Sequence, residues 1–267
     1  LFRSTNNKIS LCIPSTGLGA ESDWRRLYEA AFPVDERMPV SEISSLLSTT
    51  GMLLHRTTDK DGALLCFSLV TPMSNFSLLA YIATDQTRRS GGVGTKHMQA
   101  LLVSLREKFP QHLGLFLEIE STKEKGLSPE EEKNRQRRLQ FYLKLGAKRL
   151  IDRDYLLPSY VPGTKARYGE LLWFEYERKL EENQHKDIGP VICEIYRRGY
   201  GVSHLDEQFT RVMSQFPSVD GATCLDRDAV KQAEAESEKG TGFWKWLKAF
   251  LKRIFGGKWR SSGKSPK

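Results

Sequence analysis

The sequence lacks the features that mark membrane and secreted proteins. Its apolar runs are far shorter than the roughly 20 residues that span a bilayer. The first ten residues, LFRSTNNKIS, contain no basic segment followed by an apolar one, so no secretion signal is expected. With 39% apolar, 10% aromatic and 28% charged residues, the composition is that of a soluble globular protein. These absences favour a cytoplasmic location.

Clustered cysteines and histidines are also missing. Neither a disulfide framework nor a zinc site fits residues so widely spaced, because both need clustered or regularly spaced ligands. We therefore expect reduced, mostly buried thiols and no metal site, while a catalytic cysteine stays an alternative. The residues concerned are Cys12, Cys66, Cys193 and Cys224, and His55, His97, His112, His185 and His204.

The excess of positive charge lies at one end of the chain. The formal net charge is +8. Residues 241–267 contain eight Lys or Arg and no acidic residue, which leaves the first 240 residues neutral overall. Nucleic-acid binding by the body of the protein is therefore not expected, because such binding needs a basic patch on the domain itself.

The hydrophobic pattern predicts an α/β fold around a mixed sheet. The expected order is one strand, two helices, three strands, then alternating helix, strand, helix and two final strands. We place the strands at 8–13, 52–58, 62–72, 76–84, 113–122, 148–157 and 169–180, and the helices at 22–32, 39–51, 94–109 and 128–148. Ser22 or Asp23 is a plausible N-cap for the first helix, and Gly146 ends the last.

The pattern of the sequence changes beyond residue 181, where short helices are expected at 190–201 and 206–217. A polar, acid-rich stretch at 226–242 follows and loses its apolar stripe. We therefore divide the chain into a main domain at 1–182, a helical extension and linker at 183–240, and a basic amphipathic tail at 241–267. No internal repeat is found.

A glycine-rich loop between the strand at 76–84 and the helix at 94–109 is the strongest local signal. It reads Arg-Ser-Gly-Gly-Val-Gly at 89–94. Successive backbone N–H groups at a helix start can bind an anion, and glycine lets the backbone approach a phosphate. Neither GxxxxGK[ST] nor GxGxxG is present. A plain strand-to-helix turn therefore stays an alternative.

The spacing of Arg89, Gly92 and Gly94 resembles the Q/R-x-x-G-x-G/A signature of the GNAT superfamily of N-acetyltransferases. Tyr142 and Gly146 are in register with that family's Y-x-x-x-G-F helix end, with Ala147 in place of the usual aromatic residue. The element order agrees from about residue 8 to 180. The resemblance implies the acyl-CoA N-acyltransferase fold, with a largely antiparallel sheet flanked by helices and a helical C-terminal extension.

The same resemblance implies acetyl-CoA as the cosubstrate and assigns the residues that would hold it. Backbone groups of Ile82, Ala83 and Thr84 would face the pantetheine arm. The pyrophosphate would lie against the Arg89 side chain and the backbone of Ser90, Gly91, Gly92, Val93, Gly94 and Thr95. Tyr142 would be the general acid for the departing thiolate. The alternative for Tyr142 is an aromatic residue that only packs.

Two acids two residues apart supply candidates for the general base. Glu118 and Glu120 lie on an otherwise apolar strand and therefore on one face of it. Burying an unpaired charge costs free energy, so two acidic residues on such a strand need an explanation. Glu118 is the first candidate base and Glu120 the second. Alternatively, both acids attract a cationic substrate to the cleft, or both are exposed at a strand end.

The acceptor site is the least defined part. The segment AFPVDERMP at 31–39 resembles an F-P-x-x-E-R element of some family members, which makes Glu36 and Arg37 candidate acceptor contacts; a polar loop capped by prolines is the alternative. In the connection 154–174, any of three tyrosines is a candidate to line the cleft or simply to pack: Tyr155, Tyr160 and Tyr168.

The tail can form a basic amphipathic helix over 243–255, with Trp and Phe side chains on its apolar side. This pattern is typical of a membrane-surface segment, but docking on the body or binding an acidic partner would also use it. The overall expectation is an N-acetyltransferase that transfers acetyl directly to a primary amine of a small molecule, antibiotic, peptide or protein. The alternative is a non-catalytic acyl-CoA sensor or adaptor with a membrane-surface tail.

Overall fold

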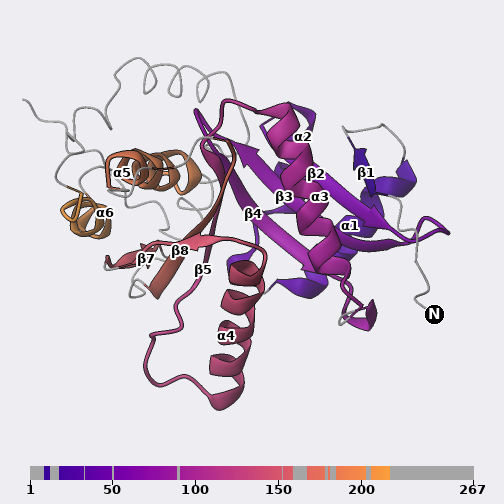
Figure 1. The fold of residues 1–267 in the computed structure, drawn as a ribbon. Coiled ribbons are helices and arrows are strands. Elements are labelled where there is room, and N and C mark those ends of the chain that lie inside the picture. The colour runs from indigo at the N-terminus through magenta and orange to yellow at the C-terminus, as the bar shows by residue number, and fades with distance from the viewer. Residues whose placement is uncertain are drawn as a thin grey trace, which may run out of the picture.

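A mixed eight-stranded sheet forms the centre of the protein (Figure 1). The computed structural model describes residues 9–12, 18–32, 34–49, 51–88, 91–151, 153–158, 167–177, 180, 185–202 and 206–216. The strand order is β1-β2-β3-β4-β5-β8-β6, and β7 also pairs with β8. The strands are β1 (Ile9–Cys12), β2 (Leu53–Thr58), β3 (Leu64–Pro72), β4 (Ser77–Thr84), β5 (Gly114–Glu120), β6 (Lys148–Arg149), β7 (Tyr155–Leu157) and β8 (Arg167–Glu175).

Every described strand pair is antiparallel except one. The exception is the pair of β4 and β5. These strands are parallel, and a helix forms the crossover connection between them. The expected mixed, largely antiparallel sheet flanked by helices is therefore confirmed. The helices are α1 (Leu18–Ala31), α2 (Val40–Ser48), α3 (Val93–Lys108), α4 (Pro129–Lys144), α5 (His185–Glu194) and α6 (Glu207–Met213), with a π-helix at Ile195–Gly199 and short 3-10 turns at Val34–Glu36 and Gln86–Arg88.

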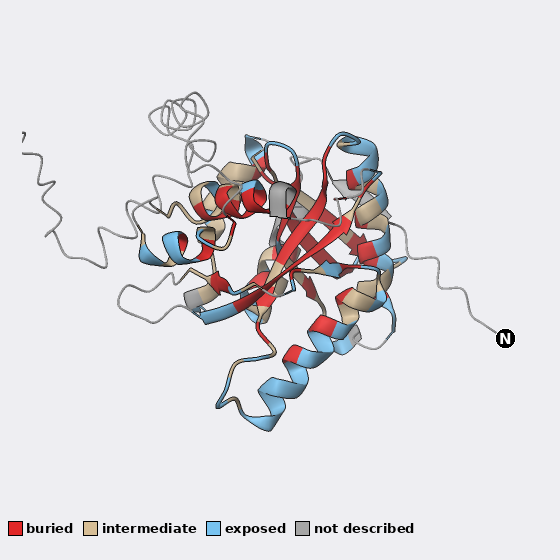
Figure 2. Cartoon of the chain, turned by 60° about the vertical axis from the view of Figure 1, so that its left-hand side comes forward, coloured by how far each residue is buried: buried red, intermediate tan, exposed pale blue. Residues whose placement is uncertain are grey.

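Helices cover both faces of the sheet and give it three main hydrophobic clusters. On one face, α3 and α4 pack on the central strands through residues such as Met98, Leu101 and Leu139. On the other face, α1 and α2 cover the N-terminal half of the sheet. The strands in this core are largely buried, whereas most of α4 is exposed (Figure 2).

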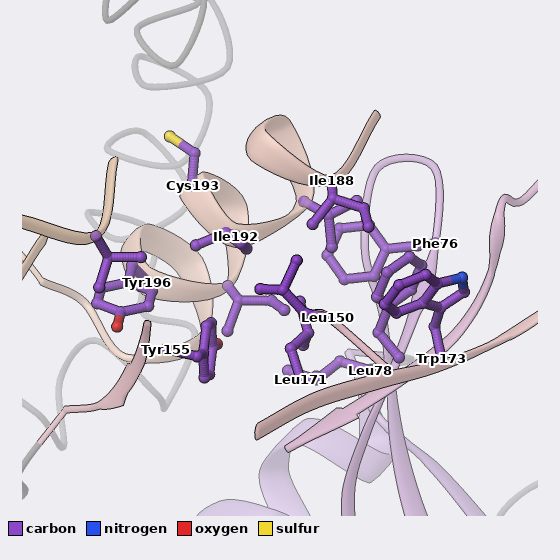
Figure 3. Close-up of a cluster of buried hydrophobic side chains, with 14 of the residues drawn as sticks. Phe76, Leu78, Leu150, Tyr155, Leu171, Trp173, Ile188, Ile192, Cys193 and Tyr196 are labelled. Carbon is purple, nitrogen blue, oxygen red and sulfur yellow. The ribbon is translucent and has the colours of Figure 1, made fainter. Parts of the chain in front are cut away.

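The rest of that second face is covered by the described part of the extension, residues 185–202 and 206–216. Ile188, Ile192 and Tyr196 pack in the same cluster as Phe116 and Trp173 of the sheet (Figure 3). Burial of several large apolar side chains contributes about 2 kcal/mol each relative to exposure. The extension is therefore docked on the sheet by a shared core, up to residue 216. The stretch 226–242 and the expected amphipathic helix at 243–255 lie outside the described residues.

Several expected boundaries are wrong, including the end of the last strand, which is at Glu175 and not at 180. The first helix begins at Leu18, so neither Ser22 nor Asp23 is its N-cap. The helix expected from 190 begins at His185, and its buried apolar face carries it through Pro190. The strand expected over 148–157 is broken into β6 and β7. Asp154 between them exchanges two hydrogen bonds with the Gln215 side chain of the extension, at 2.8 and 2.9 Å, which takes this backbone out of the ladder.

The cysteines differ from the expectation at one position. Cys66 is a free, buried thiol, as expected. Cys193 is disulfide-bonded, and its partner is outside the side chains that the structure describes. The expectation of reduced thiols is therefore wrong at Cys193. Disulfides are rare in the cytosol, so this bond does not support the expected cytoplasmic location.

Candidate active site

The centre of the sheet opens where β4 and β5 part. The two strands pair only over three residues, ending at Leu79 opposite Leu117. Directly beyond, β3 pairs Val70 with Leu79 but Leu69 with Tyr81, which leaves Ala80 as a β-bulge. A bulge bends its strand and increases the local twist. The backbone of β4 from Ala80 to Thr84 therefore diverges from the end of β5.

Side chains on β5 alternate between the two faces of the sheet at this opening. Leu115, Leu117 and Ile119 pack with α3 and α4. Phe116 packs with the extension instead. Glu118 follows the same alternation, since its two hydrogen-bond partners come from β7 and from the extension. The carboxylate of Glu118 thus faces the side of the sheet opposite α4.

Glu118 is half-buried and held by two phenols. Tyr155 Oη donates to its Oε1 at 2.5 Å, and Tyr200 Oη donates to its Oε2 at 2.8 Å. Burial raises the pKa of this carboxyl to about 7, although both phenol hydrogen bonds work in the opposite direction. A carboxylate that titrates near neutral pH can accept a proton from an attacking ammonium or amine.

Glu120 has a different environment from Glu118. Its carboxylate pairs with Arg135 at 3.2 Å and with Arg138 at 2.8 Å, both on α4. Arg135 is buried and also pairs with Glu124 at 2.5 Å. The two acidic residues of the strand therefore do not share one environment. The ion pairs of Glu120 connect the end of β5 to α4. Its carboxylate is engaged by two guanidinium groups, which favours Glu118 as the candidate base.

Tyr142 lies near the C-terminal end of α4, on the face opposite Glu118. The helix ends in a Schellman motif, in which Ala147 N–H donates to the Tyr142 carbonyl and Gly146 N–H donates to the Leu143 carbonyl, both at 3.0 Å. Gly146 has a φ of +95°, which explains why glycine stands there. Burial raises the pKa of the Tyr142 phenol to about 12. The phenol is therefore protonated at neutral pH and able to donate a proton.

The start of α3 has no side-chain cap. Gly92 is its N-cap, with a φ of +71° in the left-handed region, and no acidic residue lies in the first turn. By contrast, α4 has a capping box from Ser128 and three glutamates in its first turn. An added Cβ at Gly92 would meet nothing within 4 Å, so the space beside Gly92 at the start of the helix is open. The first turn of α3 can therefore accept an anion.

The glycine loop is joined to the rest of the site by close packing. An added Cβ on Gly94 would lie 3.4 Å from Thr84 Oγ1 and 3.7 Å from the Phe141 ring. Val93 is buried against Leu65 and Cys66 of β3. The predicted contacts Ile82, Ala83 and Thr84 are the last residues of β4, beside the opening. Of the predicted pyrophosphate residues, Gly91, Gly92, Val93, Gly94 and Thr95 are described, whereas Arg89 and Ser90 lie outside the described residues.

The segment before α2 lies on the same face as Glu118. Tyr81 of β4 donates to the Glu36 carbonyl and accepts from Met38 N–H, both at 3.1 Å. The Glu36 carboxylate lies 3.6 Å from the Arg167 guanidinium at the start of β8. Arg37 is directed to the Glu29 carbonyl of α1 at 3.3 Å. Of the two predicted acceptor contacts, Glu36 is therefore linked across to β8, whereas Arg37 is held by α1.

Tyr200 was not among the residues singled out from sequence. It lies 82 positions after Glu118 and belongs to the extension, so no local spacing connects the two. Tyr155 was weighed as a cleft residue, and the structure places it against Glu118. Tyr168, another of the cleft candidates, is exposed, and its hydroxyl accepts a hydrogen bond from the Arg211 guanidinium of α6 at 3.2 Å. Tyr160 lies outside the described residues.

Among the described residues, no group of three or more His, Cys, Asp or Glu side chains is arranged to hold a metal ion. Nor does any helix in that part of the chain combine the length and hydropathy needed to cross a membrane. The buried histidine on α3, His97, is satisfied by Thr57 Oγ1 at 2.8 Å and Ser68 Oγ at 2.9 Å, which is the environment of a core residue.

Solved structures share this fold. A putative GNAT-family acetyltransferase from Bacteroides thetaiotaomicron matches with a TM-score of 0.57 and 18% identity, over 73% of this chain and 99% of that one. An aminoglycoside 6'-N-acetyltransferase complexed with coenzyme A matches with a TM-score of 0.50 and 14% identity, over 65% and 99%. No family model and no curated protein matches the sequence. The resemblance to the GNAT fold is therefore confirmed at the level of structure.

Proposed function

We propose that this protein is an N-acetyltransferase that transfers acetyl from acetyl-CoA to a primary amine. The observation that carries the proposal is the opening between β4 and β5, with Glu118 on one face and Tyr142 on the other. A base is needed where the amine enters, and an acid is needed where the thiolate leaves. In the proposed reaction, Glu118 and Tyr142 act from opposite sides of this opening, as direct transfer through it requires.

Coenzyme A fits the residues on the α3 side. The uncapped first turn of α3 offers N–H groups to the pyrophosphate, and the glycines leave space for it. The end of β4, beyond its pairing with β5, offers backbone groups to the pantetheine arm. Arg89 would add a charge-assisted hydrogen bond to the phosphate. Acetyl-CoA supplies an activated thioester carbonyl when bound.

In the proposed reaction Glu118 accepts a proton from the incoming amine, directly or through a water. The amine nitrogen forms a bond to the acetyl carbon, and the carbon–sulfur bond breaks. Tyr142 donates its phenolic proton to the departing thiolate sulfur and is reprotonated from solvent. The result is an amide and free coenzyme A. Acid–base groups of this kind typically contribute about 10²–10⁴-fold in rate.

The nearby cysteine is unsuited to forming an acyl-enzyme. Burial raises the pKa of the Cys66 thiol to about 12, so little thiolate exists at neutral pH. Its sulfur accepts a hydrogen bond from Thr84 Oγ1 at 3.3 Å. This supports direct transfer in a ternary complex over a two-step mechanism through that cysteine.

A panel of amines tests the proposal. The purified chain would be incubated with acetyl-CoA and, in turn, a polyamine, an aminoglycoside, a peptide with a free N-terminus and a lysine peptide. Release of free thiol and the mass of the product would be measured, with Glu118→Gln as the control. Amine-dependent thiol release that Glu118→Gln abolishes supports the enzyme. Tight binding of CoA with no turnover of any amine would instead support the sensor or adaptor alternative.

A further inference from the structure

We propose that Tyr200, contributed by the C-terminal extension, is a positioning residue for Glu118 and makes the extension part of the active site. The inference rests on the proposed function, because it assigns Glu118 the role of base. Its basis is geometric. Tyr155 donates to one carboxylate oxygen of Glu118 and Tyr200 donates to the other.

Two donors on two different oxygens fix the plane of the carboxylate. A single hydrogen bond would leave the Glu118 side chain free to rotate about its last torsion, which is broad for this residue type. With both phenols bound, the remaining lone pairs of the two oxygens point in set directions. A base must lie within hydrogen-bond reach of the proton it removes, so its orientation bears directly on the rate.

The backbone around Tyr200 is built to hold it in place. Tyr200 follows the π-helix Ile195–Gly199, and its N–H donates to the Ile195 carbonyl at 3.1 Å. Two residues later, Val202 N–H donates to the Tyr196 carbonyl at 2.9 Å. Short π-helical segments occur frequently at functional sites, because the wider turn re-aims the side chains that follow it. Here the turn aims Tyr200 at β5.

Tyr196 connects this turn to β7. Its phenol donates to the Leu156 carbonyl, and its ring lies edge-on to Tyr155, with centroids 5.9 Å apart. The ring of Tyr200 is 6.3 Å from that of Tyr196. Three tyrosines thus form a continuous group, in which Tyr196 supports the two that contact Glu118 (Figure 3 shows Tyr155 and Tyr196).

The extension is anchored at both ends of this group. Upstream, Glu194 accepts from the backbone N–H and the hydroxyl of Ser74 at 2.9 and 2.8 Å, and also pairs with Arg198. Downstream, the side chain of Gln215, two residues after the end of α6, exchanges two hydrogen bonds with the Asp154 backbone between β6 and β7. These contacts, together with the shared core, hold Tyr200 over β5 without relying on its own hydrogen bond.

The groups around Glu118 determine how much the hydrogen bond from Tyr200 stabilises its charged form. In the part of the chain that the structure describes, no basic side chain forms an ion pair with Glu118. The facing titratable groups are the phenols of Tyr155 and Tyr200, and that of Tyr196, whose own pKa is affected by the Glu118 charge. On the same strand, Glu120 is paired with α4. Among the described residues, the hydrogen bonds that stabilise the charged carboxylate against the cost of burial come from the phenols of Tyr155 and Tyr200.

The first test is the pH profile of kcat/KM for Tyr200→Phe in the full chain. Removing one hydrogen bond to the carboxylate favours its protonated form, so the pKa of Glu118 rises. A hydrogen bond to a charged group contributes about 1.5–3 kcal/mol, and one pH unit corresponds to about 1.4 kcal/mol. The acidic limb of the profile should therefore move up by about one to two pH units.

Tyr196→Phe is the matched control. It removes a phenol from the same segment, but one that donates to the Leu156 carbonyl rather than to Glu118. A purely structural role for the extension predicts similar profiles for the two variants. The proposal predicts an upward shift of the acidic limb for Tyr200→Phe only. An unshifted limb in Tyr200→Phe, with folding intact by circular dichroism, overturns it.

A readout that needs no turnover separates this proposal from the proposed function. With ¹³C-labelled glutamate, the Glu118 carboxyl signal is assigned by its loss in Glu118→Gln and titrated in the wild type and in Tyr200→Phe. An upward shift supports the positioning role even if no amine is acetylated, and an unchanged titration refutes it. Should Tyr200→Phe fold poorly, 3-fluorotyrosine at position 200 keeps the packing and donates more strongly, so the titration should move down instead.

Discussion

Leu79 of β4 and Leu117 of β5 form the last pair between these two parallel strands, and the strands diverge directly beyond it. The next residue on β5 is Glu118, and the next on β4 is the bulged Ala80. The same point in the sheet thus creates the opening and places a carboxylate beside it.

Glu118→Gln should lower kcat/KM by about 10²–10⁴-fold, because the amide cannot accept the proton of the amine. In the wild type, activity should rise with pH through about 7, since burial raises the pKa of this carboxyl to that value. Steady-state kinetics from pH 5.5 to 9 measure both effects. Glu120→Gln is the matched control: it breaks the ion pairs with α4 and should reduce thermal stability while the acidic limb stays in place.

Tyr142→Phe should reduce kcat strongly while the Kd for coenzyme A stays within about twofold, because the phenol acts on the leaving thiolate and not on binding. Calorimetric titration with coenzyme A gives the Kd, and thiol release gives kcat. Tyr176→Phe, which removes another buried phenol of the same cluster, serves for comparison and should retain most of the activity. Equal activity of Tyr142→Phe and the wild type would argue for a packing role.

Gly92→Val should raise the Kd for coenzyme A by tenfold or more, a change of about 1.4 kcal/mol. Valine at a φ of +71° is strained, and its side chain would occupy the open space over the first turn of α3. Gly126→Val separates strain from blockage. Gly126 also has a left-handed φ, +83°, and open space around it, but it lies in the loop before α4. If both variants bind coenzyme A as the wild type does, the first turn of α3 is not the phosphate site.

Local patterns allowed much of this site to be predicted. Three of these patterns each reflect a requirement of the nearby backbone, such as the Schellman motif. They are the apolar run of β4, the glycines after it, and the four-residue step from Tyr142 to Gly146. The role of Tyr200 could not be predicted, because its contact with Glu118 depends on how the extension packs. Likewise, the break between β6 and β7 follows from the distant Gln215. The sequence also could not show that Glu118 and Glu120 have different partners, because this depends on which element faces each carboxylate.

His97→Gln should flatten the dependence of stability on pH. Burial, and secondarily the charge of His55, lowers the pKa of His97 to about 3, whereas an unfolded histidine titrates near 6.5. The unfolded state therefore binds more protons below about pH 6.5, and the free energy of unfolding falls as pH drops from there toward 3. The contribution of His97 to this slope is about 1.4 kcal/mol per pH unit.

Urea unfolding of the wild type and of His97→Gln between pH 4.5 and 7.5 measures this contribution. Glutamine keeps a donor and an acceptor for Thr57 and Ser68, so the variant should fold, though with lower stability at pH 7. His55, whose pKa burial lowers to about 4, gives the remaining slope in both proteins. Because acidic groups such as Glu118 titrate alike in both, the difference between the two curves isolates His97. Parallel curves would mean that the pKa of His97 is the same in the folded and unfolded states, as for an imidazole exposed to solvent.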